Sequence, residues 1–227
     1  MKYDVIIVGA GPGGIFSSYE LTKNDPALKV AVFEAGNSLE KRKCPIDGKK
    51  VKSCINCATC AIMSGFGGAG AFSDGKYNIT NDFGGTLFEH IGKEEAIDLM
   101  NYVDHINMTH GGEGTKMYST AGTDLKKVCM QNKLKLLDAS VRHLGTDINY
   151  IVLENLYAEL KDKIDFFFRT PVETIEVIDG GYRVHTADAS YECEKCVISV
   201  GRSGSKWMEK VCKKLEIPTS SNRVDIG

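Results

Sequence analysis

The chain contains 227 residues, of which 28 are Lys or Arg and 30 are Asp or Glu, giving a formal net charge of −2. This balance lacks the positive excess that binding to nucleic acids or membrane surfaces requires, so we expect no nucleic-acid or membrane partner. Hydrophobic residues make up 42% and charged residues 26% of the chain, a composition typical of a folded globular protein and not of a disordered one.

The chain holds 24 glycines and 8 cysteines. The glycines indicate backbone that lies close to another group. The first residues run into a glycine-rich turn without an apolar leader, and no apolar run reaches the ~20 residues that a bilayer crossing needs. We therefore expect a cytoplasmic protein whose cysteines are reduced, metal-bound or catalytic and do not form structural disulfides.

Three elements are predicted near the N-terminus. Residues 3–8 form a short apolar run typical of a strand buried on both faces of a parallel sheet. Residues 13–24 have helical character and end at an Asp-Pro pair, and residues 29–33 form a second apolar strand. A strand, a helix and a strand within so short a length form the βαβ unit that binds mononucleotides.

A GxGxxG motif, made by Gly9, Gly11 and Gly14, separates the first strand from the helix. In such a turn the first glycine permits the tight bend, the second lets the backbone approach a pyrophosphate, and the third lets the helix pack closely on the strand. The N–H groups at the start of the helix then face the phosphates. Glu34, at the end of the second strand, is placed to accept hydrogen bonds from a ribose diol. An ordinary glycine-rich turn is the alternative, which the neighbouring strand, helix and acid disfavour.

The second half of the chain contains short strands separated by turns. Residues 165–168, 171–178 and 182–186 are predicted strands, and residues 196–200 form an apolar strand that runs into Gly201. This pattern predicts a β-meander followed by a strand that delivers a glycine to a cofactor, as in FAD domains. It favours FAD over NAD, and no second GxGxxG indicates a separate NAD-binding domain.

Four further segments carry a resemblance to a known family: residues 64–76 with the sequence SGFGGAGAFSDGK, residues 142–147, residues 200–204 and residues 224–227. With the N-terminal motif, they resemble the bacterial FAD-dependent dehydrogenases described as NAD/FAD-utilising, which have a glutathione-reductase-2-type FAD fold. Chains of that family continue past the last segment to a Gly-Asp motif that completes FAD binding. We therefore expect this sequence to be the N-terminal half of a longer enzyme.

The resemblance implies an α/β fold, namely an FAD/NAD(P)-binding, Rossmann-like, three-layer ββα domain with an inserted α+β cap region. We expect residues 1–78 and 141–227 to form the discontinuous FAD-binding domain, and residues 79–140 to form the cap or substrate region. The residues expected to contact the cofactor are Gly9, Gly11, Pro12, Gly13, Gly14, Glu34, Ala35, Gly36, Val172, Gly201 and Arg202, and the resemblance adds Gly67, Gly68, Ala69, Gly70, Ser73, Asp74 and Lys76 on the flavin side.

Four cysteines lie in one stretch of the chain, at Cys44, Cys54, Cys57 and Cys60. Their spacing resembles part of a ferredoxin ligand set, so an iron–sulfur cluster is the leading interpretation. Zinc fits the same four thiolates, and a redox-active dithiol beside the flavin and unliganded thiols are the other interpretations. Cys193 and Cys196 form a second Cys-x-x-Cys pair, which we interpret as structural because it lies where a strand is predicted.

Arg142 and His143 are the catalytic candidates. They lie where a predicted strand enters a Gly-Thr-Asp turn, which can present the arginine to an anionic substrate and the histidine as a proton donor or acceptor. A solvated arginine and a structural histidine are the alternatives.

Taken together, these patterns predict an FAD-dependent oxidoreductase, a dehydrogenase or reductase that passes hydride or electrons through the flavin. Its partner would be a small-molecule substrate or a redox partner. Two other interpretations remain. One is a non-catalytic cofactor-binding or electron-transfer fragment that acts with a partner or the missing half, and the other is an NAD-dependent Rossmann dehydrogenase.

Overall fold

The computed structural model describes residues 1–221, so the 224–227 segment of the resemblance lies outside the described residues. The chain forms two compact units. The first consists of Met1–Gly70 and the residues from Ala158 onward, and the second is Ala71–Tyr157. Within residues 1–221, no helix combines the length and the apolar composition that crossing a membrane requires.

The second unit is larger than the predicted insertion of 79–140. Strand β3 (Lys76–Ile79) pairs in antiparallel register with β5 (Ser140–His143), so both ends of the segment belong to the same small sheet. The predicted boundaries, after residue 78 and before residue 141, fall within these two strands, and the predicted division into an FAD-binding domain and an inserted region stays a prediction. The role of this unit as a cap or substrate region stays a prediction.

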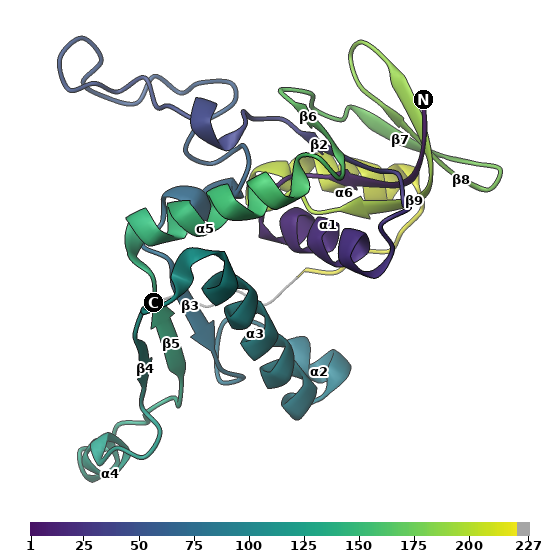
Figure 1. Ribbon diagram of the computed structural model, residues 1–227. Coiled ribbons are helices and arrows are strands. Elements are labelled where there is room, and N and C mark those ends of the chain that lie inside the picture. Colours follow the sequence, from purple (N-terminus) through teal and green to yellow (C-terminus); the bar gives the residue numbers. More distant parts are fainter. Residues whose placement is uncertain (222–227) are drawn as a thin grey trace. The chain divides into compact units, whose positions relative to one another are not determined.

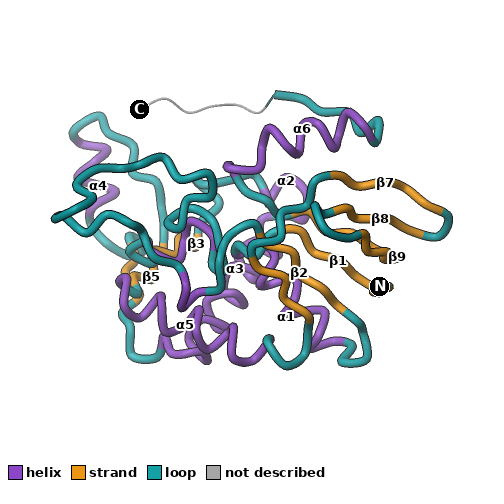
Figure 2. Tube along the Cα trace, turned by 90° about the horizontal axis from the view of Figure 1, so that it is seen from above, coloured by secondary structure: helices purple, strands orange, loops and turns teal. Residues whose placement is uncertain are grey.

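Six strands form one sheet in the first unit, in the order β6-β2-β1-β9-β8-β7 (Figure 2). Their bounds are β1 Lys2–Val8, β2 Val30–Glu34, β6 Asp165–Phe168, β7 Thr174–Ile178, β8 Gly181–His185 and β9 Ser190–Ile198. Strands β6, β2, β1 and β9 are parallel, whereas β7, β8 and β9 form an antiparallel meander. The predicted α/β class with a Rossmann-like parallel sheet is confirmed, and β9 joins the meander to the parallel strands.

Strand β1 is irregular near its start, and this irregularity shapes the core. The N–H groups of Asp4 and Val5 both donate to the carbonyl oxygen of Lys29, and the pairing of β1 with β9 skips Asp4. Regular alternation would place Tyr3 and Ile6, three residues apart, on opposite faces of the sheet. Here both side chains pack in the same buried cluster.

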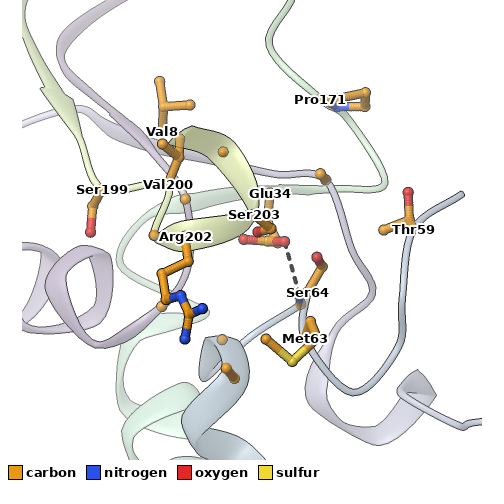
Figure 3. Close-up of a pocket in the computed structure, with 18 of the residues that line it drawn as sticks. Val8, Glu34, Thr59, Met63, Ser64, Pro171, Ser199, Val200, Arg202 and Ser203 are labelled. Carbon is orange, nitrogen blue, oxygen red and sulfur yellow. Dashed lines mark hydrogen bonds between the residues drawn. The ribbon is translucent and has the colours of Figure 1, made fainter. Parts of the chain in front are cut away.

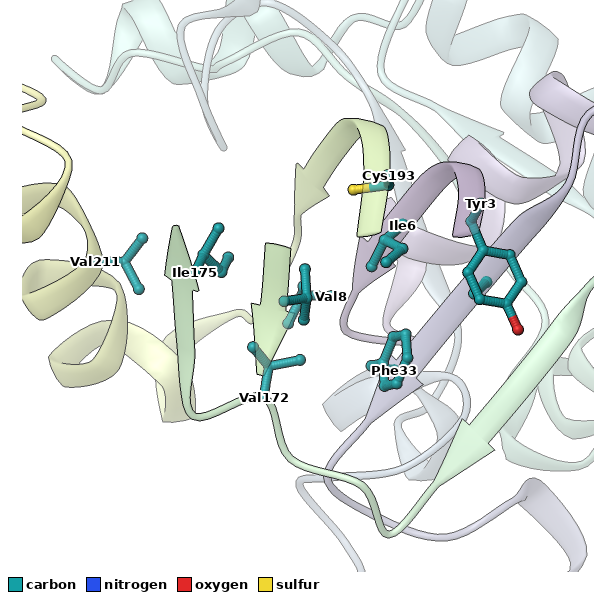
Figure 4. Packing of buried hydrophobic residues seen from close by; sticks show 10 residues of the cluster. Tyr3, Ile6, Val8, Phe33, Val172, Ile175, Cys193 and Val211 are labelled. Atoms are coloured by element: carbon teal, nitrogen blue, oxygen red, sulfur yellow. The ribbon is translucent and has the colours of Figure 1, made fainter. Parts of the chain in front are cut away.

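Helices cover the two faces of the parallel strands. On one face the buried cluster includes Val8, Phe33 and Val211, the last from helix α6 (Ser205–Lys214) (Figure 4). The ring of Phe33 stacks on that of Phe167 with centroids 4.6 Å apart. On the other face lies helix α1 (Pro12–Asn24), which comes so close that an added Cβ on its Gly14 would touch the side chain of Ile7. The first unit therefore has the layered build that the sequence predicts.

The second unit is an α+β arrangement (Figure 1). Its sheet has the order β3-β5-β4, with β4 at Met117–Ser119. Its helices are α2 Leu87–Ile91, α3 Lys93–Asn107, α4 Leu125–Gln131 and α5 Gly145–Leu160, the last of which continues into the first unit, and a π-helical turn, Met108–Gly112, extends α3. The chain between β4 and β5 carries α4 at its tip (Figure 1).

Candidate nucleotide-binding site

A cavity of about 710 Å³ opens in the first unit, and every residue that lines it belongs to that unit (Figure 3). Val8, Glu34 and Ser199 lie at or just beyond the carboxyl ends of β1, β2 and β9 and contribute to its wall. Ligands of open parallel sheets bind outside the carboxyl ends of the strands. The cavity therefore lies where the fold places a ligand.

The glycine motif adopts the geometry that a nucleotide turn needs. Gly9 has a φ of +103°, which side-chain-bearing residues avoid, and a Cβ there would collide with the carbonyl of Ser199. A Cβ on Gly14 would collide with the carbonyl oxygen of Gly9, so the helix can begin close to the strand only with glycine at this position. Above Gly11, in contrast, the nearest heavy atom to an added Cβ is 3.9 Å away, which leaves the backbone open to the cavity.

The start of α1 carries an uncompensated positive end. Gly11 is its N-cap and supplies no side-chain hydrogen bond, Pro12 follows, and no acid lies in the first turn. Arg202 also lines the cavity, from the 3₁₀ turn Arg202–Gly204 that follows β9. Its guanidinium is exposed and forms no hydrogen bond or ion pair with any described residue. Helix N-terminal N–H groups and a free arginine are the usual ligands of a phosphate.

The Glu34 carboxylate joins three segments of the cavity wall. Its Oε2 accepts from the N–H of Ala10 at 2.8 Å, and its Oε1 accepts from the N–H groups of Gly36 and Gly65 at 2.8 and 2.9 Å. A carboxylate offers about four acceptor positions, so one position on Oε2 remains for a ligand hydroxyl. Glu34 is only 7% exposed, and three of its hydrogen bonds hold the protein together.

Val172 lines the same cavity, and both its backbone N–H and its backbone C=O are unpaired among the described residues. The residue is also buried. Buried backbone groups are nearly always paired, so an unpaired donor and acceptor beside a cavity indicate a ligand that supplies both partners. Val172 lies at the end of the segment that follows β6.

The remaining predicted cofactor contacts divide between the two units. Ala35, Gly68, Ala69, Gly70, Gly13 and Gly201 line the cavity. Gly36 and Gly67 do not line it, but Gly36 packs against the backbone of Ser64, and the N–H of Gly67 donates to the carbonyl of Ala10 at 2.8 Å. Ser73, Asp74 and Lys76 belong to the second unit, where Lys76 pairs with Asp74 at 2.7 Å. The predicted cofactor contact of these three residues stays a prediction.

Several wall residues had no signal in the sequence. Thr59, Met63, Ser199 and Trp207 line the cavity without belonging to a recognisable motif. Trp207 could only have been suspected from its place on the amphipathic helix that follows Gly201. Ser199 lies near the end of the predicted strand 196–200 that runs into Gly201, and its hydroxyl lies beside Gly13.

The cysteine-rich segment does not form a metal site. All eight cysteines are free thiols, and within residues 1–221 no three Cys, His, Asp or Glu side chains are gathered to hold a metal ion. Cys54 and Cys57 are exposed. Buried Arg42 anchors the segment by donating to the carbonyl oxygens of Ala61, Ile62 and Phe66 at 2.6–2.9 Å. The residues present therefore do not fit the predicted iron–sulfur cluster.

Arg142 lies in an ion pair within the second unit. Its Nε and Nη2 donate to the two carboxylate oxygens of Asp104 at 3.0 and 2.7 Å, and its Nη1 donates to the carbonyl of Thr115 at 2.7 Å. Both side chains are largely buried. His143, beside it on β5, is exposed. A guanidinium with three protein acceptors is held as a structural group, so the alternative interpretation of Arg142 gains support, and a contact with substrate stays a prediction.

Comparison with known proteins adds to this geometry. The Thi4 family model matches residues 1–40, which contain the glycine motif and Glu34. No curated protein matches the sequence. Two solved structures with a similar fold are glycine oxidase from Geobacillus kaustophilus, with 17% identity and a TM-score of 0.53, and glycine oxidase from Bacillus cereus, with 15% identity and a TM-score of 0.50. Each match covers 95% of this chain and 58% of the glycine oxidase. These likenesses establish the fold.

Proposed function

We propose that the first unit binds FAD and that the protein is an FAD-dependent oxidoreductase. One observation carries the proposal: a single cavity brings together an open glycine turn, the uncapped start of α1, the Glu34 carboxylate and the unpaired peptide of Val172. The glycine turn and the start of α1 suit a diphosphate, Glu34 suits a ribose, and Val172 suits a base. The fold shared with two glycine oxidases supports FAD over NAD, as does the meander.

The residues of the cavity would each hold one part of the cofactor. The backbone at Gly11, the first N–H groups of α1 and Arg202 would bind the diphosphate. The free acceptor position on Glu34 would take one ribose hydroxyl, and Val172 would pair with the edge of the adenine. A bound flavin supplies hydride acceptance, while the protein supplies orientation and electrostatics.

The nature of the substrate is inferred only as a class of molecule. We infer a small-molecule substrate or a redox partner, with the second unit as its cap region. The chain spans 58% of the length of the glycine oxidases it resembles. The free thiols support our inference of a reducing, cytoplasmic setting.

An absorbance spectrum of the purified protein, recorded under anaerobic conditions with iron analysis, tests the proposal. We expect flavin bands near ~450 nm, FAD released on denaturation and no stoichiometric iron. The Gly11→Ala variant sharpens the test, because its Cβ has room in the fold but occupies the space above the turn. It should fold normally and lose FAD. Folded wild-type protein that takes up NAD but no flavin would overturn the proposal.

A further inference from the structure

Trp207 is held in a fixed orientation at the wall of the nucleotide cavity. Its indole N–H donates to the carbonyl oxygen of Glu173 at 2.9 Å, and the ring packs against the buried cluster of the first unit. Helix α6 anchors it further, since Val211 and Cys212 on the same helix are buried. The indole therefore has little freedom to turn away from the cavity.

The hydrogen bond from Trp207 connects it to the segment that ends in the unpaired peptide. Glu173 directly follows Val172 in the chain. The same segment runs beside the end of β2, because the N–H of Thr170 donates to the carbonyl of Glu34 and that of Arg169 to the carbonyl of Gly36. Residues 169–173 therefore connect Glu34 to Trp207 through hydrogen bonds and contain Val172. All three residues lie at one end of the cavity.

The chemistry of these groups suits a purine base. A peptide N–H and C=O in sequence match the ring nitrogen and the exocyclic amine on the edge of adenine. An aromatic side chain supplies a surface on which a base can stack. The diphosphate-binding groups, Arg202 and the start of α1, supply neither feature.

We propose that Trp207 covers the face of the adenine and holds it in this cavity, where Val172 selects adenine by its edge. The inference rests on the proposed FAD site and deepens it, since it assigns the base end to a residue outside the dinucleotide motif. Trp207 acts by stacking on the base, while Val172 reads the base edge. Because the chain contains a single tryptophan, occupancy of the base end also changes the intrinsic fluorescence of the protein.

Calorimetric titration of the purified full chain, stripped of bound flavin, with ADP and with inorganic pyrophosphate tests the proposal. Replacing Trp207 by leucine keeps apolar bulk but removes the stacking surface, and Trp207→Phe keeps an aromatic face but loses the hydrogen bond to Glu173. We expect Trp207→Leu to bind ADP about tenfold more weakly and pyrophosphate as the wild type does. Trp207→Phe should recover most of the ADP affinity, and ADP should change the tryptophan fluorescence of the wild type.

The outcomes separate this inference from the proposed function. If wild-type protein binds FAD and ADP but the leucine variant matches it, Trp207 has no role at the base and the inference fails alone. Equal losses for ADP and pyrophosphate would show that Trp207 only supports the fold, which also overturns it. If the wild type binds neither FAD nor ADP, the proposed function fails as well. Inosine diphosphate should bind more weakly than ADP in every variant, because it lacks the amine that Val172 would read.

Discussion

The cavity wall of the first unit and the surroundings of Arg142 in the second unit treat their polar groups in opposite ways. In the first unit, the cavity wall leaves Arg202, the start of α1 and the peptide of Val172 without partners among residues 1–221. In the second unit, Arg142 binds both oxygens of Asp104, and His110 Nδ1 lies 2.7 Å from the carbonyl oxygen of Ile106. Buried polar groups without partners are costly unless a ligand satisfies them.

This difference separates binding groups from supporting groups better than residue type does. Arg202 and Arg142 are the same residue type, and the sequence predicts a functional role for each, Arg202 as a cofactor contact and Arg142 as a catalytic candidate. Arg202 follows Gly201, which has a φ of +62° and turns the chain along the cavity wall. Arg142 lies on β5 and reaches α3, 38 positions earlier in the sequence. Satisfied hydrogen bonds therefore support the structural interpretation of Arg142, while its contact with a substrate stays a prediction.

The largest effect is expected for Arg142→Ala. Removing one partner of a largely buried ion pair leaves the Asp104 carboxylate without compensation, so the free energy of unfolding should fall by about 3 kcal/mol. Hydrogen exchange of β5 and α3 measures this loss within the second unit. Replacing both partners, with Arg142→Met and Asp104→Leu together, should restore much of the stability. Full stability combined with lost turnover would instead identify Arg142 as a catalytic residue.

Glu34→Gln should have the next largest effect. The glutamine amide places an NH₂ group where the carboxylate accepts from backbone N–H groups, so at least one buried donor loses its acceptor. We expect a loss of about 2 kcal/mol in the stability of the flavin-free protein, measured by urea unfolding. Glu40→Gln, at an exposed carboxylate that accepts only from the Ser38 hydroxyl among the hydrogen bonds described, is the matched control and should cost much less. Unchanged stability with weakened FAD binding would mean that Glu34 acts mainly on the ribose.

Arg202→Ala should weaken ligand binding without affecting the fold. The side chain is exposed and has no hydrogen-bond or ion-pair partner among residues 1–221, so the unfolding midpoint should stay constant. Loss of one charge-assisted hydrogen bond should weaken binding of both ADP and pyrophosphate about tenfold. Lys206→Ala removes the same charge four positions later from a residue that does not line the cavity, and should leave both affinities unchanged. Equal effects of the two variants would reduce the role of Arg202 to general electrostatic attraction.

The glycine turn could be predicted from sequence because its requirements are local. Gly9 is needed for its positive φ and Gly14 because its Cβ would collide with the carbonyl oxygen of Gly9, both of which are properties of the turn itself, and the flanking strand and helix follow from their own patterns. The strands of the parallel sheet and of the meander were predictable for the same reason, because each follows from its own residue pattern. The extra hydrogen bonds of Glu34 were not, because Gly65 approaches it from 31 positions along the chain.

Long-range contacts explain what the sequence could not show. Trp207 reaches the cavity only because α6 packs on the core through Val211. Arg142 forms its ion pair only because α3, which carries Asp104, packs beside β5. The cysteine spacing suggested ligands, but spacing alone cannot bring Cys44 to the other three, and the folded segment does not gather them. The resemblance placed Lys76 at the flavin, although its nearest charge in the structure is Asp74.

The smallest expected effect concerns this last pair and decides whether Lys76 belongs with the binding groups or the supporting ones. The hydrogen bond from Lys76 lowers the pKa of Asp74. A carboxyl whose pKa is lowered on folding contributes stability above its ordinary pKa of about 4, and this contribution is lost as the pH falls through the lowered value. Lys76→Met should raise the pKa of Asp74 toward its ordinary value, as followed by NMR titration of the carboxyl carbon. The change in stability should be slight because both side chains are about half exposed. If Lys76 leaves Asp74 to contact the cofactor, FAD binding to the wild type should raise the pKa of Asp74 as the Lys76→Met substitution does. If FAD leaves the pKa of Asp74 unchanged, Lys76 keeps its ion pair with Asp74 and does not contact the cofactor.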